Sequence, residues 1–201
     1  MGENSTSVED KIIQTTIDCI ETYGFSGATN RRIAEAAGVN IAAINYYFRS
    51  KEVLIRRVME ITLNNAFDLS NVPPMPGATV QQRCIAIFLE ILEGGIRYPN
   101  ITRAHFRNLL VEGQPDAIFQ AYVTQFIDVQ AADLLARGSS LSQEEIQVAL
   151  MQIFSAVAMA VMAPSLVSRS GIDMRNSDSR KAYVTRLVEK LLTTPLGSNL
   201  G

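Results

Sequence analysis

The side chains best suited to chemistry in this chain lie close together, between residues 29 and 54. An asparagine such as Asn45 can hydrogen-bond to the edge of adenine, and alanine or isoleucine can contact the methyl group of thymine. Tyrosine hydroxyls and a lysine ammonium, as in Tyr47 and Lys51, can reach phosphate oxygens. These residue types at this spacing indicate a surface that binds nucleic acid.

Basic residues gather in the same stretch, although the chain of 201 residues has a formal net charge of -2. Between residues 29 and 57 two carboxylates, Glu35 and Glu52, stand against six cations, which leaves a surplus of four positive charges. A local surplus favours phosphate binding because each neutralised phosphate releases condensed counterions. A solvated helix face would show the same charges. The six cations are Arg31, Arg32, Arg49, Lys51, Arg56 and Arg57.

Residues suited to catalysis or metal binding are sparse. The two cysteines, Cys19 and Cys84, are 65 positions apart, which suits neither a zinc knuckle nor a redox pair. Each lies among apolar residues at helical spacing, as buried thiols do. The single histidine, His105, has no partner groups at matching spacing, so we expect it to be solvated or hydrogen-bonded. The sequence predicts no catalytic residue, no metal site and no cofactor.

The elements that position these residues are helices, because nearly every segment has a 3.6-residue apolar period and strand alternation is absent. We therefore predict an all-α fold with about nine helices and a proline-rich loop at residues 72–77. The expected helices cover residues 8–23, 30–37, 41–48, 51–69, 80–97, 101–112, 115–137, 143–163 and 178–192.

The helices at 30–37 and 41–48 form a helix-turn-helix in this prediction. Ala34 and Ala37 are small enough for close helix approach, and Gly38 can adopt the positive φ that ends the first helix. Ile44 and Phe48 are four apart and point back to the core. An ordinary helical hairpin with a wet aromatic face is the alternative. The face left outward carries Asn40, Ala42, Ala43, Asn45, Tyr46 and Tyr47, with Ile41 at its edge.

Residues 29–54 resemble the DNA-binding signature of the tetracycline-repressor (TetR) family of transcriptional regulators. The matching positions are Thr29, Arg32-Ile33-Ala34, Ala36-Ala37-Gly38-Val39, Tyr47-Phe48 and Ser50-Lys51-Glu52. Many members carry tyrosine where this chain has Asn45 and glycine near Ala43, which leaves the base preference open. The resemblance implies DNA contact by Thr29, Asn30, Arg31, Asn40, Ile41, Ala42, Ala43, Asn45, Tyr46, Tyr47 and Lys51.

The remaining helices agree in number and length with the family's ligand-binding domain. We therefore predict a helix-turn-helix DNA-binding domain at residues 1–55 and a ligand-binding and dimerisation domain at 56–201. An apolar pocket between helices is one prediction, although each such residue taken singly is more often plain core. Its residues would be Phe88, Leu92, His105, Phe106, Leu109, Phe119, Tyr122, Phe126 and Phe154.

A homodimer is expected because two recognition helices must reach half-sites roughly 34–36 Å apart, and the resemblance implies the same pairing. Residues 148–163 are apolar nearly all round, so this helix should face water on no side. It would be covered either by a second copy or within one chain. The predicted dimer interface consists of Met151, Phe154, Ala156, Val157, Met159, Ala160, Leu187 and Leu191.

These observations predict a homodimeric transcriptional regulator, a repressor that a small-molecule effector releases from double-stranded operator DNA. The alternatives are an all-helical carrier or enzyme with an incidental N-terminal hairpin, and an architectural DNA-binding protein without a ligand. The start of the chain is polar, unlike a signal peptide. The longest nearly apolar run, at residues 156–163, is too short for a bilayer. We therefore expect a cytoplasmic protein without a membrane partner.

Overall fold

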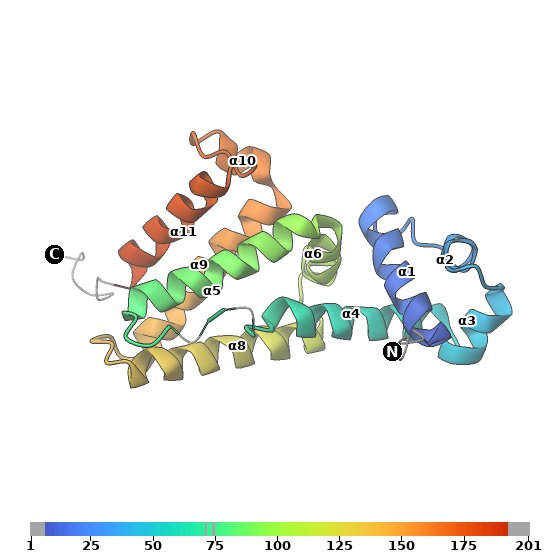
Figure 1. Ribbon diagram of the computed structural model, residues 1–201, viewed down its shortest axis with the longest axis horizontal. Coiled ribbons are helices and arrows are strands. Elements are labelled where there is room, and N and C mark those ends of the chain that lie inside the picture. Colours follow the sequence, from blue (N-terminus) through green and yellow to red (C-terminus); the bar gives the residue numbers. More distant parts are fainter. Residues whose placement is uncertain (1–6, 71, 74, 193–201) are drawn as a thin grey trace, which may run out of the picture. The chain divides into compact units, whose positions relative to one another are not determined.

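The computed structural model describes residues 7–70, 72–73 and 75–192, and the regular structure in these ranges is entirely α-helical (Figure 1). The expected all-α class is therefore confirmed. In chain order the helices are α1 (Val8–Tyr23), α2 (Asn30–Ala37), α3 (Ile41–Phe48), α4 (Lys51–Phe67), α5 (Val80–Arg97), α6 (Pro99–His105), α7 (Arg107–Glu112), α8 (Ala117–Ala136), α9 (Gln143–Met162), α10 (Pro164–Ser168) and α11 (Ser177–Leu191).

The structure has two more helices than the sequence predicts. The helix expected at 101–112 is divided at Phe106, which ends α6 and precedes α7. The expected loop after residue 163 begins instead with the short helix α10, whose first residue is Pro164. Proline suits that position because its fixed φ is helical and its missing N–H would have no partner there. The expected proline-rich loop is present at 72–73 and 75–77, while Pro74 lies outside the described residues.

Helix starts follow from side chains that accept the free backbone amides of the first turn. Asn40 Oδ1 accepts from Ala43 N at 2.8 Å and starts α3. Ser142 and Glu145 form a reciprocal capping box that starts α9, with Ser142 N donating to the Glu145 carboxylate at 2.8 Å. These bonds are local, so the sequence near each helix start determines where that helix begins.

The chain divides into two compact units. The N-terminal unit contains residues 7–65 and 98–116, and the C-terminal unit contains 66–97 and 117–192 apart from positions 71 and 74. The division predicted at residue 55 falls inside α4, a continuous helix. Residues 98–116, predicted to belong to the second domain, lie in the N-terminal unit. The functional division into DNA-binding and ligand-binding parts stays a prediction.

The N-terminal unit is built around one apolar core that holds α1, α2 and α3 together. The core residues with no exposed surface include Ile12 and Ile20 of α1, Ile33 of α2 and Ile44 of α3. Ile101 brings α6 into the same cluster. The short helices α2 and α3 therefore depend on tertiary packing, because isolated helices of eight residues are unstable in water.

A carboxylate of α1 also caps the start of α6. Tyr98 precedes α6 and makes no side-chain cap, and Pro99 has no amide hydrogen. The next two amides, of Asn100 and Ile101, both donate to the Glu21 carboxylate, at 3.0 and 3.1 Å. The Asn100 side chain adds a bond of 2.7 Å to the Glu21 carbonyl. These bonds tie α6 to α1 at the helix end where a negative charge is favoured.

In the C-terminal unit, α5 packs against α9 and α11, and α8 packs against α9. Its fully buried side chains include Phe88, Leu92, Leu134, Leu150 and Ile153. The axes of α5 and α9 approach closely at a glycine of α5. Gly95 stands beside Val161, and a Cβ added to this glycine would lie only 2.7 Å from Val161 Cγ2.

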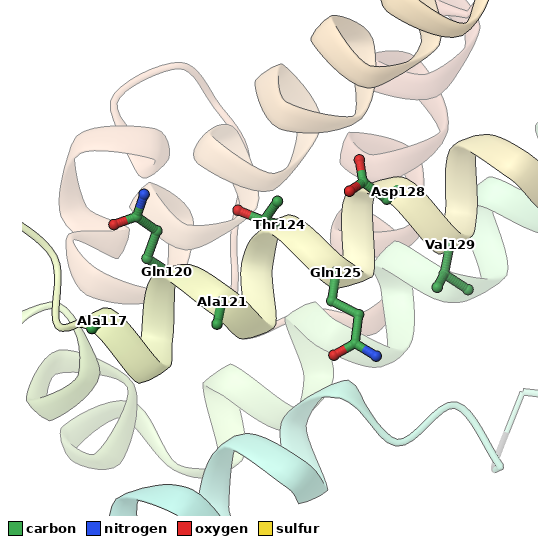
Figure 2. A pocket seen from close by; sticks show the side chains of 7 residues that line it. All are labelled: Ala117, Gln120, Ala121, Thr124, Gln125, Asp128 and Val129. Atoms are coloured by element: carbon green, nitrogen blue, oxygen red, sulfur yellow. The ribbon is translucent and has the colours of Figure 1, made fainter.

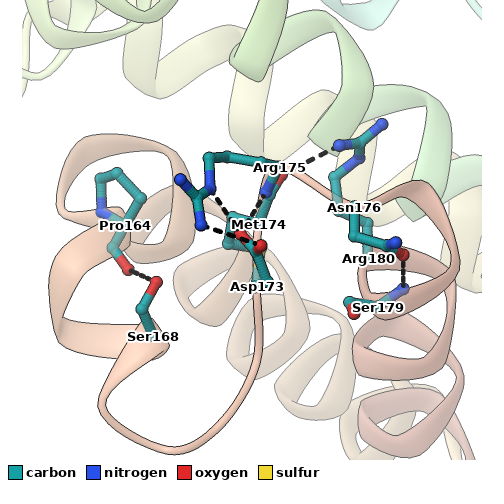
Figure 3. A network of polar contacts seen from close by, with 8 residues as sticks. All are labelled: Pro164, Ser168, Asp173, Met174, Arg175, Asn176, Ser179 and Arg180. Atoms are coloured by element: carbon teal, nitrogen blue, oxygen red, sulfur yellow. Dashed lines mark hydrogen bonds and ion pairs between the residues drawn. The ribbon is translucent and has the colours of Figure 1, made fainter.

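The turn before α11 is held by an arginine network (Figure 3). Arg180 pairs with Glu93 of α5 at 2.6 Å and donates to the Met174 carbonyl at 2.9 Å. Asn176 caps α11 by accepting from Ser179 N at 3.0 Å. The Arg180 side chain is mostly buried, so this pair is stronger than an exposed one. It fixes the start of α11 against α5.

Within a single chain the helix α9 is not covered on every side, so cover of residues 148–163 by a second copy stays a prediction. Val148, Met151 and Met159 are 41–46% exposed and follow one another at helical spacing along a single stripe. By length and composition alone α9 is apolar enough to cross a membrane, and half of its apolar window is buried. The helix is therefore a core helix with one exposed apolar stripe.

Candidate nucleic-acid interface

The turn between α2 and α3 has the geometry that the glycine at its centre allows. Gly38 adopts the left-handed conformation, with φ 65° and ψ 33°. Its amide donates to Glu35 O at 3.1 Å, and the next amide, of Val39, donates to Ala34 O at 2.9 Å. These two bonds form a Schellman motif, which satisfies the last carbonyls of α2. The predicted role of Gly38 is thus confirmed.

The helix α3 divides into an inner and an outer face, as its sequence predicts. Ile44 is fully buried and Phe48 is 4% exposed, so these two side chains hold α3 to the core. Tyr46 is 81% exposed and Tyr47 is 41% exposed on the other face. Their rings meet edge to face, with centroids 5.2 Å apart. An exposed pair of tyrosines on a short helix is an unusual feature that a core role does not explain.

All eleven predicted DNA-contact residues lie in the N-terminal unit, and eight of them are exposed. Three are half-buried: Asn30, Ala43 and Lys51. The Oδ1 atom of Asn30 is buried and has no hydrogen-bond partner among the described residues. The exposed eight are Thr29, Arg31, Asn40, Ile41, Ala42, Asn45, Tyr46 and Tyr47.

Two of these residues use only part of their hydrogen-bonding capacity within the protein. Thr29 Oγ1 accepts from Arg32 N at 3.3 Å, and Asn40 Oδ1 accepts from Ala43 N. Within the part of the chain that the structure describes, the hydroxyl hydrogen of Thr29 and the amide hydrogens of Asn40 have no acceptor, so they can donate to a ligand. Donors at the first turn of a helix are suited to bind phosphate oxygens, because the helix dipole is positive there.

The adjacent arginines of α2 have different roles. Arg32 donates to Gly27 O at 2.9 Å, and its guanidinium carbon lies 4.7 Å from the centre of the Tyr23 ring. This side chain holds the loop between α1 and α2. Arg31 is exposed and makes no such contact within the described ranges. Both side chains are exposed, but within the described ranges only the Arg32 guanidinium has partners.

The link from α3 to α4 is short and has unusual geometry, which sequence reasoning missed. Arg49 has φ 63° although it is not a glycine. Its amide donates to Asn45 O at 2.8 Å, and Ser50 N donates to Phe48 O at 2.7 Å. The Ser50 side chain caps α4, and its hydrogen bond lowers the pKa of the Glu52 carboxyl. The only feature of the sequence that could have indicated this conformation is the lack of a glycine between two helices that follow each other closely.

The predicted pocket residues separate into two groups. Six lie in the C-terminal unit, and the other three, His105, Phe106 and Leu109, lie in the N-terminal unit. Within the C-terminal unit the rings of Tyr122, Phe126 and Phe154 each contact Phe67, at centroid distances of 6.2, 5.2 and 6.2 Å. Phe88 meets Phe126 edge to face. Phe119 and Leu92 are buried in the same unit.

Sequence reasoning missed Phe67, which contacts three of the predicted pocket rings. It is the last residue of α4, and no motif sets it apart in the sequence. The distances within this aromatic cluster (Phe67, Phe88, Tyr122, Phe126 and Phe154) are those of rings in contact. The cluster is therefore a packed group of rings in this structure.

A shallow depression of about 510 Å³ lies elsewhere in the C-terminal unit, on the outer side of α8 (Figure 2). Its lining residues all belong to this single helix, and none was predicted as a pocket residue. One helix cannot enclose a ligand, so the depression is an open surface groove. The lining residues are Ala117, Gln120, Ala121, Thr124, Gln125, Asp128 and Val129.

The predicted dimer residues are only partly available to a second chain. Met151 and Met159 lie on the exposed stripe of α9, and Ala156, Leu187 and Leu191 are half-buried. Phe154, Val157 and Ala160 are buried by their own chain, so they have no free surface for a partner. Phe154 belongs to the aromatic cluster instead. Only some of the predicted residues are available because successive residues of α9 lie at different angles around the helix axis, so the buried and the exposed ones lie on different sides.

His105 is hydrogen-bonded, as expected. Its Nε2 atom lies 3.0 Å from Thr62 Oγ1, and the Thr62 hydroxyl also lies 3.0 Å from the Val58 carbonyl. Burial lowers the pKa of His105 from 6.5 to about 4, an effect that the charge of Asp116 partly opposes. The ring is neutral at pH 7. Among the described residues no group of three His, Cys, Asp or Glu side chains is placed to hold a metal ion.

Comparison with known proteins relates the helix-turn-helix to one family. Residues 12–58 match the family of bacterial regulatory proteins described as the tetR family. A probable HTH-type transcriptional regulator, YttP of Bacillus subtilis (strain 168), is 29% identical over 113 residues. The alignment covers 53% of this chain and 52% of that protein. The chain thus spans about half the length of this relative.

Solved structures resemble the chain over nearly its whole length. The crystal structure of a transcriptional regulator from Rhodococcus sp. Rha1 has a TM-score of 0.74 at 17% identity, and the match covers 92% of this chain and 96% of that one. A TetR variant from Acinetobacter baumannii AYE, solved in complex with minocycline, has a TM-score of 0.58 at 16% identity, with coverages of 91% and 97%. At such identities the likeness concerns the fold.

Proposed function

The chain belongs to the tetR family of bacterial regulatory proteins, and we propose that it is a homodimeric transcriptional regulator that binds operator DNA through α3. The observation that carries this proposal is the outer face of α3, where exposed Asn45, Tyr46 and Tyr47 stand on a helix held by buried Ile44 and Phe48. The family is one of regulators, so we set the enzyme alternative aside. A DNA-binding regulator would act in the cytoplasm.

The side chains of the N-terminal unit divide into positioning and reading groups in this proposal. Donors at helix starts, such as the Thr29 hydroxyl and the Asn40 amide, would contact phosphates together with Arg31, Tyr47 and Lys51. Such contacts fix the register but carry little sequence information. Asn45, Ala42, Ala43 and Ile41 would meet base edges in the major groove, where each base pair presents a distinct pattern.

A small-molecule effector would act through the C-terminal unit. The aromatic cluster supports this part of the proposal, because it is an apolar group of rings that a flat apolar molecule could separate and replace. The ligand would change DNA affinity only through its different affinity for the DNA-bound and free forms. We propose release from DNA, hence repression, as the outcome.

Pairing of two chains would use the exposed stripe of α9 with the half-buried side of α11. Met151 and Met159 of α9 supply apolar surface, and Leu187 and Leu191 of α11 extend it. Large exposed apolar side chains on a helix of this length favour an interface. A dimer would present two copies of α3 to half-sites roughly one DNA turn apart.

Footprinting on the DNA that flanks the protein's own gene tests the function and yields the operator. With that DNA, Tyr47→Ala and Lys51→Ala are both expected to weaken binding to all sequences. Only Lys51→Ala should reduce the salt slope, by about 0.9 for each subunit that loses the cation, because tyrosine is neutral and neutralises no phosphate. Asn45→Ala should instead lose about 1–3 kcal/mol of discrimination at one base pair. Lys190→Ala, at an exposed site on α11, is the matched control for charge.

A protein that protects no DNA, or variants that all bind the operator like the wild type, would contradict the assignment of this face. The effector is tested by thermal-shift screening with apolar compounds, followed by anisotropy on labelled operator. A compound that raises the melting temperature and lowers operator affinity supports the regulatory part. Operator binding that no stabilising compound changes would favour an architectural protein without a ligand.

A further inference from the structure

The link between α3 and α4 contains a backbone conformation that arginine rarely adopts. Arg49 has φ 63° and ψ -41°, and the residues on its two sides are joined by the 2.7 Å bond from Ser50 N to Phe48 O. A bond between residues i and i+2 with positive φ at the centre is a γ-turn of the rare, strained hand. Among the described residues only Met75 shares positive φ without being a glycine.

The strain is imposed by anchors on both sides. Phe48 is 4% exposed and Leu54 is fully buried, so α3 and α4 both have fixed positions in the core of the N-terminal unit. Only Arg49 and Ser50 lie between the two helices, which follow one another directly (Figure 1). Ser50 is itself occupied as the cap of α4, accepting from Val53 N at 3.3 Å. The change in chain direction between α3 and α4 is therefore made at Arg49.

The side chain of Arg49 does nothing for the fold that would explain its presence. It is exposed, and within the described ranges it makes no hydrogen bond and no ion pair. A glycine would adopt the same backbone angles without steric penalty. Positions where a chain breaks a local rule without a structural gain are expected at functional sites. The guanidinium lies between Tyr47 and Lys51 in the sequence, in the stretch with a surplus of positive charge.

We propose that Arg49 is a further DNA-contacting residue, which binds a backbone phosphate beside the one that Lys51 reaches. The proposal rests on the proposed function and adds a contact to the eleven residues that the family resemblance implies. The strained turn is the positioning device. Because its backbone is held from both sides, the arginine has fewer conformations to lose on binding phosphate.

The experiment separates the guanidinium from the backbone with three variants of the full-length protein. Arg49→Ala and Arg49→Gly both remove the charge, but only glycine relieves the positive φ. Arg49→Lys keeps a charge at the same place. Affinity for a duplex of random sequence is measured by anisotropy across a series of salt concentrations, because phosphate contacts are independent of sequence. Melting temperatures of the same variants show whether relief of the positive φ at residue 49 stabilises the protein.

For each subunit whose Arg49 contacts the duplex, Arg49→Ala and Arg49→Gly are expected to lower the salt slope by about 0.9 and the affinity about eightfold at 0.1 M salt. Arg49→Lys should retain most of both. Arg49→Gly alone should melt higher than the wild type, by about 2–4 °C. Arg186→Ala, which removes an exposed charge of α11, is the matched control and should leave the slope unchanged.

The results distinguish failure of this inference from failure of the proposed function. A wild-type protein that binds no DNA overturns both. A wild-type protein that binds DNA, together with Arg49→Gly at the same affinity and slope, overturns the inference alone. An equal loss in Arg49→Lys would also overturn it, because the charge would then not be the group that binds.

Discussion

Single residues of the helix-turn-helix have sharply divided roles, because adjacent side chains of a helix point about 100° apart. Arg31 and Arg32 show this in α2. Arg32 lies over the Tyr23 ring and donates to the Gly27 carbonyl, so it secures the loop between α1 and α2. Arg31 is left exposed for a ligand. Loss of Arg32 would therefore act through folding, whereas loss of Arg31 would act through binding.

His105 gives the stability of the N-terminal unit a specific pH dependence. Burial lowers its pKa from 6.5 to about 4, so the unfolded chain binds a proton between these values and the folded chain does not. The contribution to stability is complete above pH 6.5 and is lost as the pH falls toward 4. At pH 5 the loss should be about 2 kcal/mol, from roughly 1.4 kcal/mol per unit of pKa shift.

Urea unfolding of the wild type and of His105→Gln at pH 7.5 and 5.0 checks this prediction. His105 is the only histidine in the chain, and the other titrating groups are common to both proteins. The glutamine variant should be less stable at pH 7.5 but less sensitive to pH. Equal losses of stability in the two proteins between pH 7.5 and 5.0 would contradict the assignment to His105.

Between whole elements, the close approach of α5 and α9 gives two neighbouring glycines opposite roles. A Cβ on Gly95 would lie 2.7 Å from Val161 Cγ2 and 3.2 Å from its Cγ1, and a β-branched side chain has little freedom to move away. A Cβ on Gly94 would meet nothing within 4 Å. Gly94 is therefore replaceable, whereas Gly95 sets the spacing of the two helices.

We expect Gly95→Ala to destabilise the C-terminal unit by about 1–3 kcal/mol through overpacking. Gly94→Ala should stabilise it by up to about 1 kcal/mol, since alanine has the higher helix propensity. Chemical denaturation of the two variants and of the wild type measures the sign of each change in the free energy of unfolding. Gly95→Ala combined with Val161→Ala tests the cause, because removing the clashing methyl groups should recover part of the loss. Two variants with the same sign would refute the packing argument.

Local signals explain why most elements could be predicted from the sequence. Thr29, Asn40 and Ser142 cap the helices they precede, and Gly38 ends α2, all through bonds within a few residues. The start of α6 at Pro99 could not be predicted, because α6 takes its cap from Glu21, far away in the chain. Helix boundaries that depend on tertiary bonds leave no periodic signal.

The candidate site was predictable to a similar extent. The inner and outer faces of α3 follow from a spacing of four between Ile44 and Phe48. The pocket and dimer residues required the packing of α9, which decides that Val157 is buried and Met159 is exposed. Both are apolar residues on one helix, and they differ only in which side of α9 packs against α5 and α8. Phe67 escaped prediction for the same reason.

For the whole molecule, the proposed function links operator binding to pairing of chains through the exposed stripe of α9. We expect Met159→Glu to place a charge in the proposed interface and to convert the dimer to a monomer in sedimentation equilibrium. Operator affinity should fall with it, because one recognition helix then binds without the second. The matched control is Val129→Glu on the exposed groove of α8, since Val129 is an apolar residue 55% exposed.

If the dimer persists in Met159→Glu but is lost in Val129→Glu, the interface lies at the groove of α8 and not at the stripe of α9. Persistence in both variants would contradict pairing through either surface. Sedimentation at several protein concentrations separates a weakened dimer from an absent one, because the monomer fraction of the former depends on concentration.

The burial of both native cysteines has a practical consequence. Cys19 and Cys84 are 3% and 1% exposed, and burial raises the pKa of both thiols, that of Cys84 to about 12. Thiols of this kind react slowly with maleimides at neutral pH. A spin label directed to a new cysteine on α3, such as Ala42→Cys, would therefore find one reactive sulfur per chain without any change to the native ones. In the proposed dimer, pulsed resonance spectroscopy would then measure the separation of the two copies of α3, with and without a candidate effector.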